Sequence, residues 1–379
     1  MSQQTTKGAR REERPTIVIL SRRCSCPDGI QDTLQALLTA VTPPEHGTFP
    51  PHRPVNPHLP ALLQCLLTSF TASQFPFQKL NYCMHYIMSI FSYIASGISS
   101  FVVVTVSLFA LGQKVPRAAF VARCLAAYGS LLLCAAYGVI ASVVLRLAGY
   151  GRVSQWATAR SFKWVMRYTT GVRFDVIEGV EHLSTRPAVF ISNHQSELDV
   201  LMLGTIFPPY CSVTAKKSLK NIPFLGWFMA LSRTVFIDRA NRETAVKAFD
   251  GAADEMKNHR QSVFIFPEGT RSYSDKPEML PFKKGAFHLA VKAGVPIVPV
   301  VTENYSHVLS PRALRFDAGT IKIKVLPPII TQGMTSADVD GLTKSTQESM
   351  LKTLLEMAHE EEEEIEASVA KGASTAVEI

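Results

Sequence analysis

Two long runs without a charged side chain most constrain how this chain can fold. The first, Leu80 to Gln113, holds 34 residues and no Asp, Glu, Lys or Arg, and the second, Cys124 to Leu145, holds 22. A helix needs about 20 residues at 1.5 Å each to cross a hydrocarbon core of roughly 30 Å. Both runs pass this test, so residues 79–150 are predicted to form a membrane-embedded helical hairpin. A buried helix pair in a soluble protein is the less favoured alternative.

Basic residues flank the two runs unequally. Three lie between the runs, in what we expect to be a short loop: Lys114, Arg117 and Arg123. Five follow the second run: Arg146, Arg152, Arg160, Lys163 and Arg167. Because Lys and Arg accumulate on the cytoplasmic side of a membrane span, the part of the chain after the hairpin is expected to face the cytosol.

The chain before the hairpin is predicted to be a proline-rich, mostly disordered extension, residues 1–78. Nine of the 23 prolines fall in the first 60 residues, a density that excludes long helices and central strands. No signal peptide is recognisable, and Glu12 and Glu13 argue against a transit peptide.

Charge and cysteine usage narrow the class of partner. The formal net charge of +8 favours anionic partners, either phosphate-bearing ligands or a membrane surface. No zinc finger or arginine-rich recognition helix is present, so nucleic acid is not an expected partner. The seven cysteines form no CxxC pair, which is typical of reduced structural thiols and predicts neither a disulfide framework nor a metal site.

After the hairpin, short apolar runs alternate with helical patterns over residues 151–340. The expected strands are 173–177, 188–192, 212–215, 235–237, 262–266, 297–300 and 320–325. The expected helices are 200–206, 225–231, 242–258 and 285–293. This alternation predicts a layered α/β fold with a largely buried sheet. Residues 341–379 are expected to form a helix near 343–357 and then a solvated acidic tail.

The heptapeptide NHQSELD, residues 193–199, follows the strand expected at 188–192. A strand–turn–helix corner would let the Asp199 carboxylate reach back to the His194 ring. A carboxylate that holds one imidazole nitrogen leaves the other free to act as a base. The alternative is structural, because Ser196 and Asp199 also form the pattern of a helix capping box. The heptapeptide alone favours this structural interpretation.

The stretch FPEGTRS, residues 266–272, follows another expected strand. Gly269 would let the backbone approach a ligand, Thr270 offers a hydroxyl, and the planar Arg271 guanidinium matches a phosphate in two bonds. By itself the stretch favours the structural interpretation, a loop that carries a surface arginine.

Two further stretches complete the set. KKSLKNIPFLGW, followed by FIDR, carries lysines that could hold an anion and a helix entry marked by Pro223 and Gly226. VPIVPV, residues 295–300, has no ionisable group, and its prolines predict an edge strand or an unusual backbone that packs on a lipid chain. The alternative for both stretches is purely structural.

In this order and at these separations, the four stretches resemble the blocks of the glycerolipid acyltransferase family, and most of all those of the 1-acyl-sn-glycerol-3-phosphate acyltransferases. The resemblance covers roughly residues 160–335. The matching positions are Asn193, His194 and Asp199; Lys217, Pro223, Gly226 and Arg239; Glu268, Gly269, Thr270 and Arg271; and the proline-bearing fourth block with Pro296.

The resemblance implies an enzyme that transfers an acyl group from acyl-CoA, a co-substrate rather than a cofactor, to lysophosphatidate, with release of CoA and formation of phosphatidate. His194, oriented by Asp199, would take the proton of the sn-2 hydroxyl. Lys217, Arg239 and the loop residues Glu268, Gly269, Thr270 and Arg271 would bind the phosphate, and backbone N–H groups near Gly269 would face the oxyanion. No serine nucleophile is required, and no GxSxG elbow is present.

Three alternatives stay open at this point. An esterase would need a nucleophile motif, and a non-catalytic membrane-shaping protein would not need intact His194 and Asp199. An acyltransferase for glycerol 3-phosphate or for another lysophospholipid would use the same residues. A two-span protein that uses cytosolic acyl-CoA is expected in the endoplasmic reticulum membrane.

Overall fold

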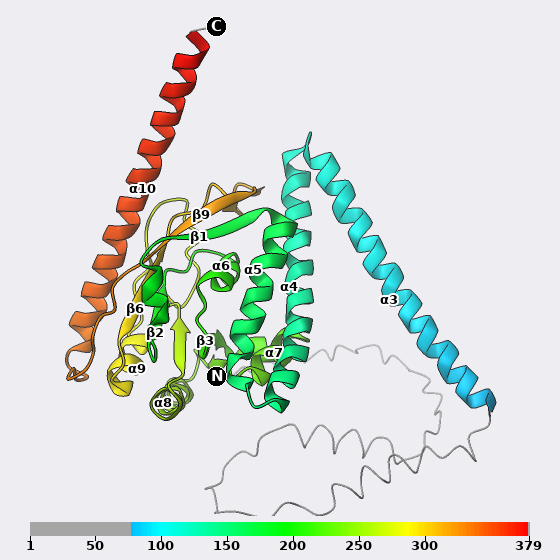
Figure 1. Cartoon of the computed structure of the whole chain (residues 1–379), viewed down its shortest axis with the longest axis horizontal. Coiled ribbons are helices and arrows are strands. Elements are labelled where there is room, and N and C mark those ends of the chain that lie inside the picture. Colours follow the sequence, from blue (N-terminus) through cyan, green and yellow to red (C-terminus); the bar gives the residue numbers. More distant parts are fainter. Residues whose placement is uncertain (1–76, 378–379) are drawn as a thin grey trace, which may run out of the picture. The chain divides into compact units, whose positions relative to one another are not determined.

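The computed structural model describes residues 77–377 (Figure 1). The extension expected over residues 1–78 lies outside this range, apart from residues 77 and 78, which begin a helix. The chain divides into two compact units, Met1–Met84 and His85–Ile379. The second unit holds the sheet and every predicted site residue.

The two uncharged runs form helices α3 (Phe77–Gly112) and α4 (Pro116–Leu147). The segments Met84–Gly112 and Pro116–Leu147 are long and apolar enough to cross a membrane, by length and composition. From residue 84 to 104, α3 is exposed at every position. Two helices of membrane-spanning length were predicted, and the described residues contain two such helices.

The expected basic loop between these helices is much shorter than predicted. Pro116, at the first turn of α4, starts the helix because its fixed φ suits that position, so Arg117 and Arg123 lie within the helix. Arg123 donates a hydrogen bond to the carbonyl of Phe316 at 3.0 Å and pairs with Asp317 at 3.7 Å. The guanidinium therefore holds α4 to the α/β domain.

Helix α4 packs on the domain along one face. Small and apolar residues of this face are buried against α5 (Ser154–Thr170) and α7 (Leu225–Leu231), and Figure 1 shows α4 and α5 side by side. A Cβ atom at Gly138 would lie 2.7 Å from the Phe228 ring and 2.8 Å from Thr158, so this contact needs a glycine. The second apolar helix is thus packed into the α/β domain.

A seven-stranded sheet with the order β1-β9-β6-β2-β5-β3-β4 forms the centre of the domain. Its strands are β1 (Val172–Glu178), β2 (Val189–Ser192), β3 (Cys211–Lys216), β4 (Val235–Ile237), β5 (Ser262–Ile265), β6 (Ile297–Thr302) and β9 (Gly319–Val325). All neighbours run parallel except β6 and β9. The expected α/β layers and all seven expected strands are confirmed.

Strand β6 contradicts its sequence interpretation. The prolines of VPIVPV predicted an edge strand or an unusual backbone, and the edge is wrong, because β6 lies between β9 and β2 and is buried at every position. The missing N–H of Pro299 is tolerated because pairing with β9 begins only at Val300, while Ile297 bridges to Ile329. Since β6 is enclosed in the core, it offers no surface to a lipid chain.

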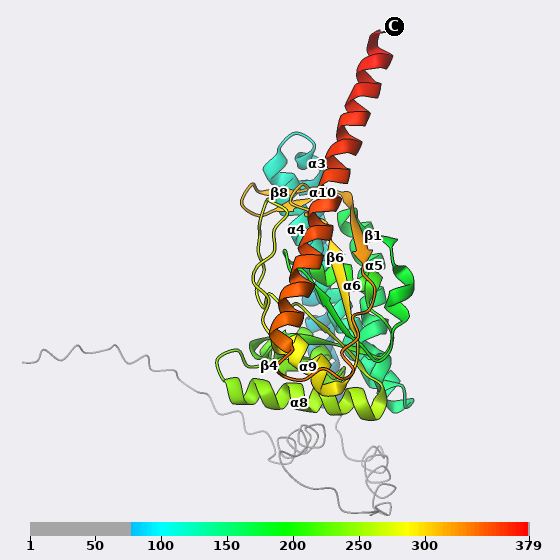
Figure 2. The same cartoon turned by 90° about the vertical axis from the view of Figure 1, so that its left-hand side faces the viewer.

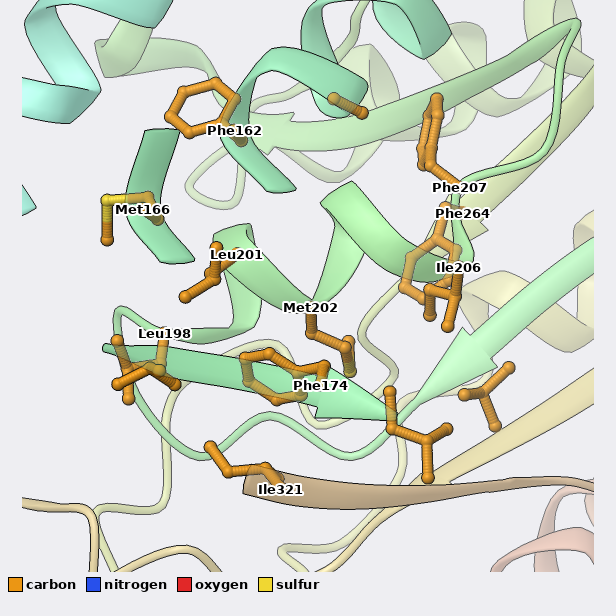
Figure 3. Close-up of a cluster of buried hydrophobic side chains, with 14 of the residues drawn as sticks. Phe162, Met166, Phe174, Leu198, Leu201, Met202, Ile206, Phe207, Phe264 and Ile321 are labelled. Carbon is orange, nitrogen blue, oxygen red and sulfur yellow. The ribbon is translucent and has the colours of Figure 1, made fainter. Parts of the chain in front are cut away.

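Alternate residues of the central strands point to opposite faces of the sheet and build two cores. On one face, Phe190 of β2 and Phe264 of β5 pack with α5 and α6 (Asp199–Ile206). Figure 3 shows this cluster, with Leu201, Met202 and Ile206 of α6 lying among Phe174 and Ile321 from the strands. Helix α6, which begins at Asp199, is thereby fixed over the sheet.

The other face is covered by α8 (Arg242–His259), α9 (Gly285–Ala293) and α10 (Val339–Val377), as Figure 2 shows. The acidic run was expected to be a tail beyond the last helix, but α10 continues through it. Glutamate favours helix, and basic side chains of other elements lie beside this run: Lys324 pairs with Glu360 at 2.8 Å, and the His307 ring lies 3.6 Å from Glu361. A two-stranded ribbon of β7 (Leu309–Ser310) and β8 (Arg315–Phe316) was not predicted.

Candidate active site

The NHQSELD turn connects β2 to α6 at the carboxyl end of the sheet. Buried Asn193 fixes the start of the turn, because its side chain donates to the Thr302 carbonyl at 2.8 Å and accepts the Thr302 N–H at 3.0 Å. These bonds continue the pairing of β2 with β6 by one residue. The asparagine therefore aims the next residue, His194, away from the core.

His194 and Asp199 form the pair that the sequence predicted. His194 Nδ1 lies 2.7 Å from Asp199 Oδ2, and the same oxygen accepts the N–H of Gln195 at 2.8 Å. Because this oxygen accepts hydrogen bonds, Nδ1 carries the ring proton and Nε2 keeps its lone pair. The Asp199 side chain is 1% exposed and that of His194 is 16% exposed. The geometry is that of an oriented imidazole whose ring remains partly exposed.

The capping-box interpretation is half right. Asp199 Oδ2 also accepts the Ser196 N–H at 3.2 Å, as the acid of a capping box does. The Ser196 hydroxyl accepts from the N–H of Leu198, however, and the helix begins only at Asp199. Asp199 thus closes the turn and orients His194 at once.

The loop after β5 is joined to this turn by its backbone. The Ser272 N–H donates to the His194 carbonyl at 2.9 Å, and the Tyr273 N–H donates to the Gln195 carbonyl at 3.1 Å. Strands β2 and β5 are parallel neighbours, which brings their carboxyl ends together. The Phe266 ring stacks on His194, with 4.2 Å between ring centroids and 20° between planes. The two motifs therefore form one site.

Glu268 holds the loops rather than a phosphate. Its side chain is buried, Oε1 accepts the His194 N–H at 2.7 Å, and Oε2 accepts the Leu280 N–H at 3.0 Å. Burial raises the pKa of Glu268 to about 7. The predicted role in phosphate binding does not fit this placement, because both oxygens already accept backbone N–H groups.

Gly269 adopts a left-handed conformation, with φ of 70°, beneath the side chain of Lys283. The left-handed φ favours glycine here, whereas the 2.7 Å contact of a Cβ atom would be with Lys283 Nζ, the mobile end of a lysine side chain. The Gly269 N–H donates to the Phe266 carbonyl at 3.1 Å and is not free for an oxyanion. Within residues 77–377, the N–H groups of Thr270 and Arg271 have no hydrogen-bond acceptor.

Arg271 reaches back to the NHQSELD turn. Its Nη1 lies 3.1 Å from Glu197 Oε1, and Tyr273 donates to the same oxygen at 2.6 Å. Arg271 Nε is buried and has no hydrogen-bond partner among the described residues. One side of the guanidinium is therefore anchored, while its Nε–H lacks an acceptor.

The KKSLKNIPFLGW stretch and the FIDR stretch that follows it add two exposed cations. Lys217 begins η3 (Lys217–Asn221) and pairs with Asp238 at 3.2 Å, and this bond lowers the pKa of Asp238. Arg239 donates to the Gly269 carbonyl and so lies beside the β5 loop. Gly226 lets α7 pack on η3, since a Cβ atom would lie 2.1 Å from the Lys220 carbonyl oxygen. Pro223 is exposed at the entry to α7, and Pro296 is half-buried before β6.

Two residues at the site were missed in the sequence. Lys283 follows the FPEGTRS loop in a basic pair with Lys284, a weak signal that was available. Tyr305 is buried and donates to Asp199 Oδ1 at 2.7 Å. No sequence pattern links Tyr305 to a residue 106 positions earlier.

An oriented His–Asp pair, a cationic loop beside it and no serine nucleophile at the histidine define the class of the protein. The serines that flank His194 are buried, and their hydroxyls bond to Asn193 and Tyr305. These hydroxyls are already engaged, and the His–Asp pair has the geometry of a base that can activate an acceptor hydroxyl.

Comparisons with known proteins agree with this class. The Acyltransferase family model matches residues 176–303. The 1-acyl-sn-glycerol-3-phosphate acyltransferase of Saccharomyces cerevisiae is 46% identical over 60% of this chain and 74% of its own. The human beta form is 37% identical over 60% of this chain and 81% of its own. The chain belongs to the 1-acyl-sn-glycerol-3-phosphate acyltransferase family.

The comparison with solved structures found the Thermotoga maritima enzyme PlsC, described as a 1-acyl-sn-glycerophosphate (LPA) acyltransferase. It is 25% identical, with a TM-score of 0.48, over 68% of this chain and 95% of its own.

Proposed function

We propose that this protein transfers an acyl group from acyl-CoA to the sn-2 hydroxyl of 1-acyl-sn-glycerol 3-phosphate, which gives phosphatidate and CoA in phospholipid biosynthesis. The observation that carries the proposal is the 2.7 Å bond from His194 Nδ1 to Asp199, beside a cationic loop, in a chain of this family. The relatives are named for this reaction.

The chemical step needs one base and no metal or acyl-enzyme. His194 Nε2 takes the proton of the sn-2 hydroxyl as the oxygen attacks the thioester carbonyl and the C–O bond forms. The tetrahedral oxyanion then collapses, the C–S bond breaks, and the imidazolium returns the proton to the sulfur of CoA. Asp199 stabilises the imidazolium between these two transfers. The N–H groups of Thr270 and Arg271 are the loop's available donors for the oxyanion.

Phosphate recognition falls to the cations around Gly269. Arg239 bonds to its carbonyl, Lys283 lies over its Cα, and Arg271 follows two residues later. The buried Nε–H of Arg271 lacks an acceptor, and a phosphate oxygen would supply one. Lys217 adds charge at the rim.

Membrane attachment would keep this site where its lipids reside. Helix α3 exposes large apolar side chains, among them Phe91, Ile94 and Ile98. The excess of basic residues after α4 supports a cytosolic catalytic domain, and use of acyl-CoA supports the endoplasmic reticulum membrane.

One assay tests the function. Membranes that contain the full chain or its His194→Ala variant are given labelled oleoyl-CoA with lysophosphatidate, lysophosphatidylcholine or glycerol 3-phosphate, and the products are separated. Label in phosphatidate with the wild-type protein alone is the expected result. Preferential labelling of another acceptor would replace lysophosphatidate in the proposal, and equal labelling with both proteins would refute it.

A further inference from the structure

Tyr305 lies three residues beyond the end of β6 and outside all four sequence motifs. Its side chain is fully buried, and its hydroxyl lies 2.7 Å from Asp199 Oδ1 and 2.9 Å from Ser196 Oγ. We propose that Tyr305 is a positioning residue for acyl transfer, which holds the Asp199 carboxylate in the plane that orients His194. This inference rests on the proposed role of His194 as the base.

The direction of each hydrogen bond follows from the number of protons. A phenol has one proton, and Tyr305 donates it to Asp199 Oδ1. The Ser196 hydroxyl must then donate to the Tyr305 oxygen, while it accepts the N–H of Leu198 at 3.1 Å. Serine, tyrosine and aspartate thus form a chain in which each bond polarises the next.

The chain leaves the carboxylate no freedom to turn. Oδ1 accepts from Tyr305, and Oδ2 accepts from the Gln195 N–H and the His194 ring. Rotation about χ2 would break bonds at both oxygens in a buried site, where an unmade hydrogen bond is costly. The position of His194 Nε2 therefore depends on the Tyr305 hydroxyl, which donates to Oδ1, the carboxylate oxygen that does not contact the His194 ring.

Tyr305 is itself held firmly in place. Its N–H lies 3.4 Å from Gln195 Oε1, and its ring meets the Phe174 ring edge-on, with centroids 6.1 Å apart. Burial and the Asp199 charge raise the pKa of Tyr305 well above its usual value, so the phenol stays a proton donor throughout the working pH range.

The hydroxyl can be separated from the packing of the ring. A phenylalanine would occupy the same volume beside Phe174 and would lose only the bonds to Asp199 and Ser196. The test uses the full chain in membranes, with initial rates measured while each substrate is varied in turn across a range of pH. Tyr210→Phe is the matched control, because Tyr210 stacks on Arg186 away from the site.

We expect Tyr305→Phe to lower kcat on the order of 10-fold, the effect of one hydrogen bond to a charged group, with both KM values almost unchanged. Without the phenol donor at Oδ1, the Asp199 carboxylate places more negative charge beside the His194 ring. This charge stabilises the imidazolium. The acidic limb of the kcat profile should therefore move to higher pH. Ser196→Ala, which keeps the Tyr305–Asp199 bond, should lower kcat less, by about 3-fold, with a smaller move in the same direction.

A wild-type kcat and pH profile in folded Tyr305→Phe would overturn the proposal. So would a loss of rate that merely follows the amount of folded enzyme, with an unmoved acidic limb. If Tyr305→Phe does not fold, an unmoved limb in Ser196→Ala overturns the proposal and a moved limb supports it. Activity retained by His194→Ala would instead refute the proposed base, which separates that failure from this one.

Discussion

The buried carboxylate of Glu268 accepts the backbone N–H of His194 at 2.7 Å. Its other oxygen accepts the N–H of Leu280 at 3.0 Å, so one side chain ties the base to the loop that precedes α9. A carboxylate in this place has two consequences: it fixes the backbone of the base without touching its ring, and it makes stability depend on pH.

That dependence has a definite sign. The pKa of Glu268 is raised from 4.5 to about 7 by burial, so the folded protein binds this proton more tightly than the unfolded chain does. The resulting contribution to the free energy of unfolding is complete below pH 4.5 and is lost as pH rises through about 7. Two and a half pKa units correspond to at most about 3 kcal/mol.

Glu268→Gln removes this titration. We expect the difference in melting temperature, wild type minus variant, to decrease as the pH rises from about 5 to about 8. Thermal melts of both proteins at several pH values measure the difference. Glu243→Gln, on the exposed face of α8, is the control and should show no such trend. A constant difference across the range would mean that Glu268 does not titrate there.

His194→Ala should abolish acyl transfer while the protein stays folded and membrane-bound. A general base contributes about 10²–10⁴-fold, and no other ring lies against Asp199 Oδ2 in the described residues. Asp199→Asn should also be severe, because an amide stabilises the wrong tautomer. Initial rates and melting curves check both variants, with exposed His288→Ala as the control. Near-full activity in Asp199→Asn with reduced stability would favour a purely structural Asp199.

Arg271→Lys should raise the KM for lysophosphatidate and leave that for acyl-CoA less affected. Lysine keeps the charge but loses the two parallel bonds that a guanidinium gives to phosphate. Arg271→Ala should be worse, by on the order of 2–5 kcal/mol, and would leave Glu197 unpaired. Kinetics with each substrate varied in turn decide the matter. Arg233→Lys, in a surface pair with Glu255, is the control, and equal changes in both KM values would indicate an arginine that only braces the loop.

Gly226→Ala should destabilise the protein and reduce activity. The new Cβ would lie 2.1 Å from the Lys220 carbonyl oxygen, so η3 and its cation Lys217 must move. Gly251→Ala offers the opposite case, because nothing lies within 4 Å of its Cβ position in α8. It should stabilise the protein by about 0.5–1 kcal/mol. Melting temperatures of the two variants, measured together, should move in opposite directions.

An arginine on α3 should weaken membrane attachment. Ile98 is 60% exposed, and a charge at the centre of a span costs roughly 2.5–3.5 kcal/mol. We expect Ile98→Arg, combined with Val102→Arg, to lower the fraction of protein that resists alkaline extraction. Val246→Arg adds a charge at a 50% exposed position of α8 and should not lower this fraction. Full resistance of the double variant would show that α3 is not the anchor.

The fold could be predicted from the sequence wherever local pattern decides it. Each of the seven apolar runs expected as strands is a strand with bounds within one or two residues of those predicted, because a buried strand needs a short run of this kind. The order of the strands could not be predicted in the same way. The prolines of β6 indicated an edge, and only the late start of its pairing with β9 makes a central place tolerable.

The site was predictable where both partners lie within one motif. His194 and Asp199 are five residues apart, and their bond follows from a strand–turn–helix corner. Tyr305 and Glu268 meet this corner from distant parts of the chain, so their contacts depend on the sheet order. Glu268 was assigned to phosphate because a sequence does not show burial. The length of α10 was underestimated because the partners of its acidic run lie on other elements.

The two bonds that join the loops of the site run from the Ser272 and Tyr273 N–H groups to the His194 and Gln195 carbonyls. Every amino acid except proline carries the same backbone donor, so these bonds do not depend on which side chains the loop presents. Apart from Phe266, Glu268 and Gly269, which themselves hold the loop and His194, side chains of the β5 loop such as Thr270 and Ser272 can therefore be exchanged while His194 keeps its place. For enzyme engineering, this makes acceptor choice and catalytic geometry separable properties of one short segment.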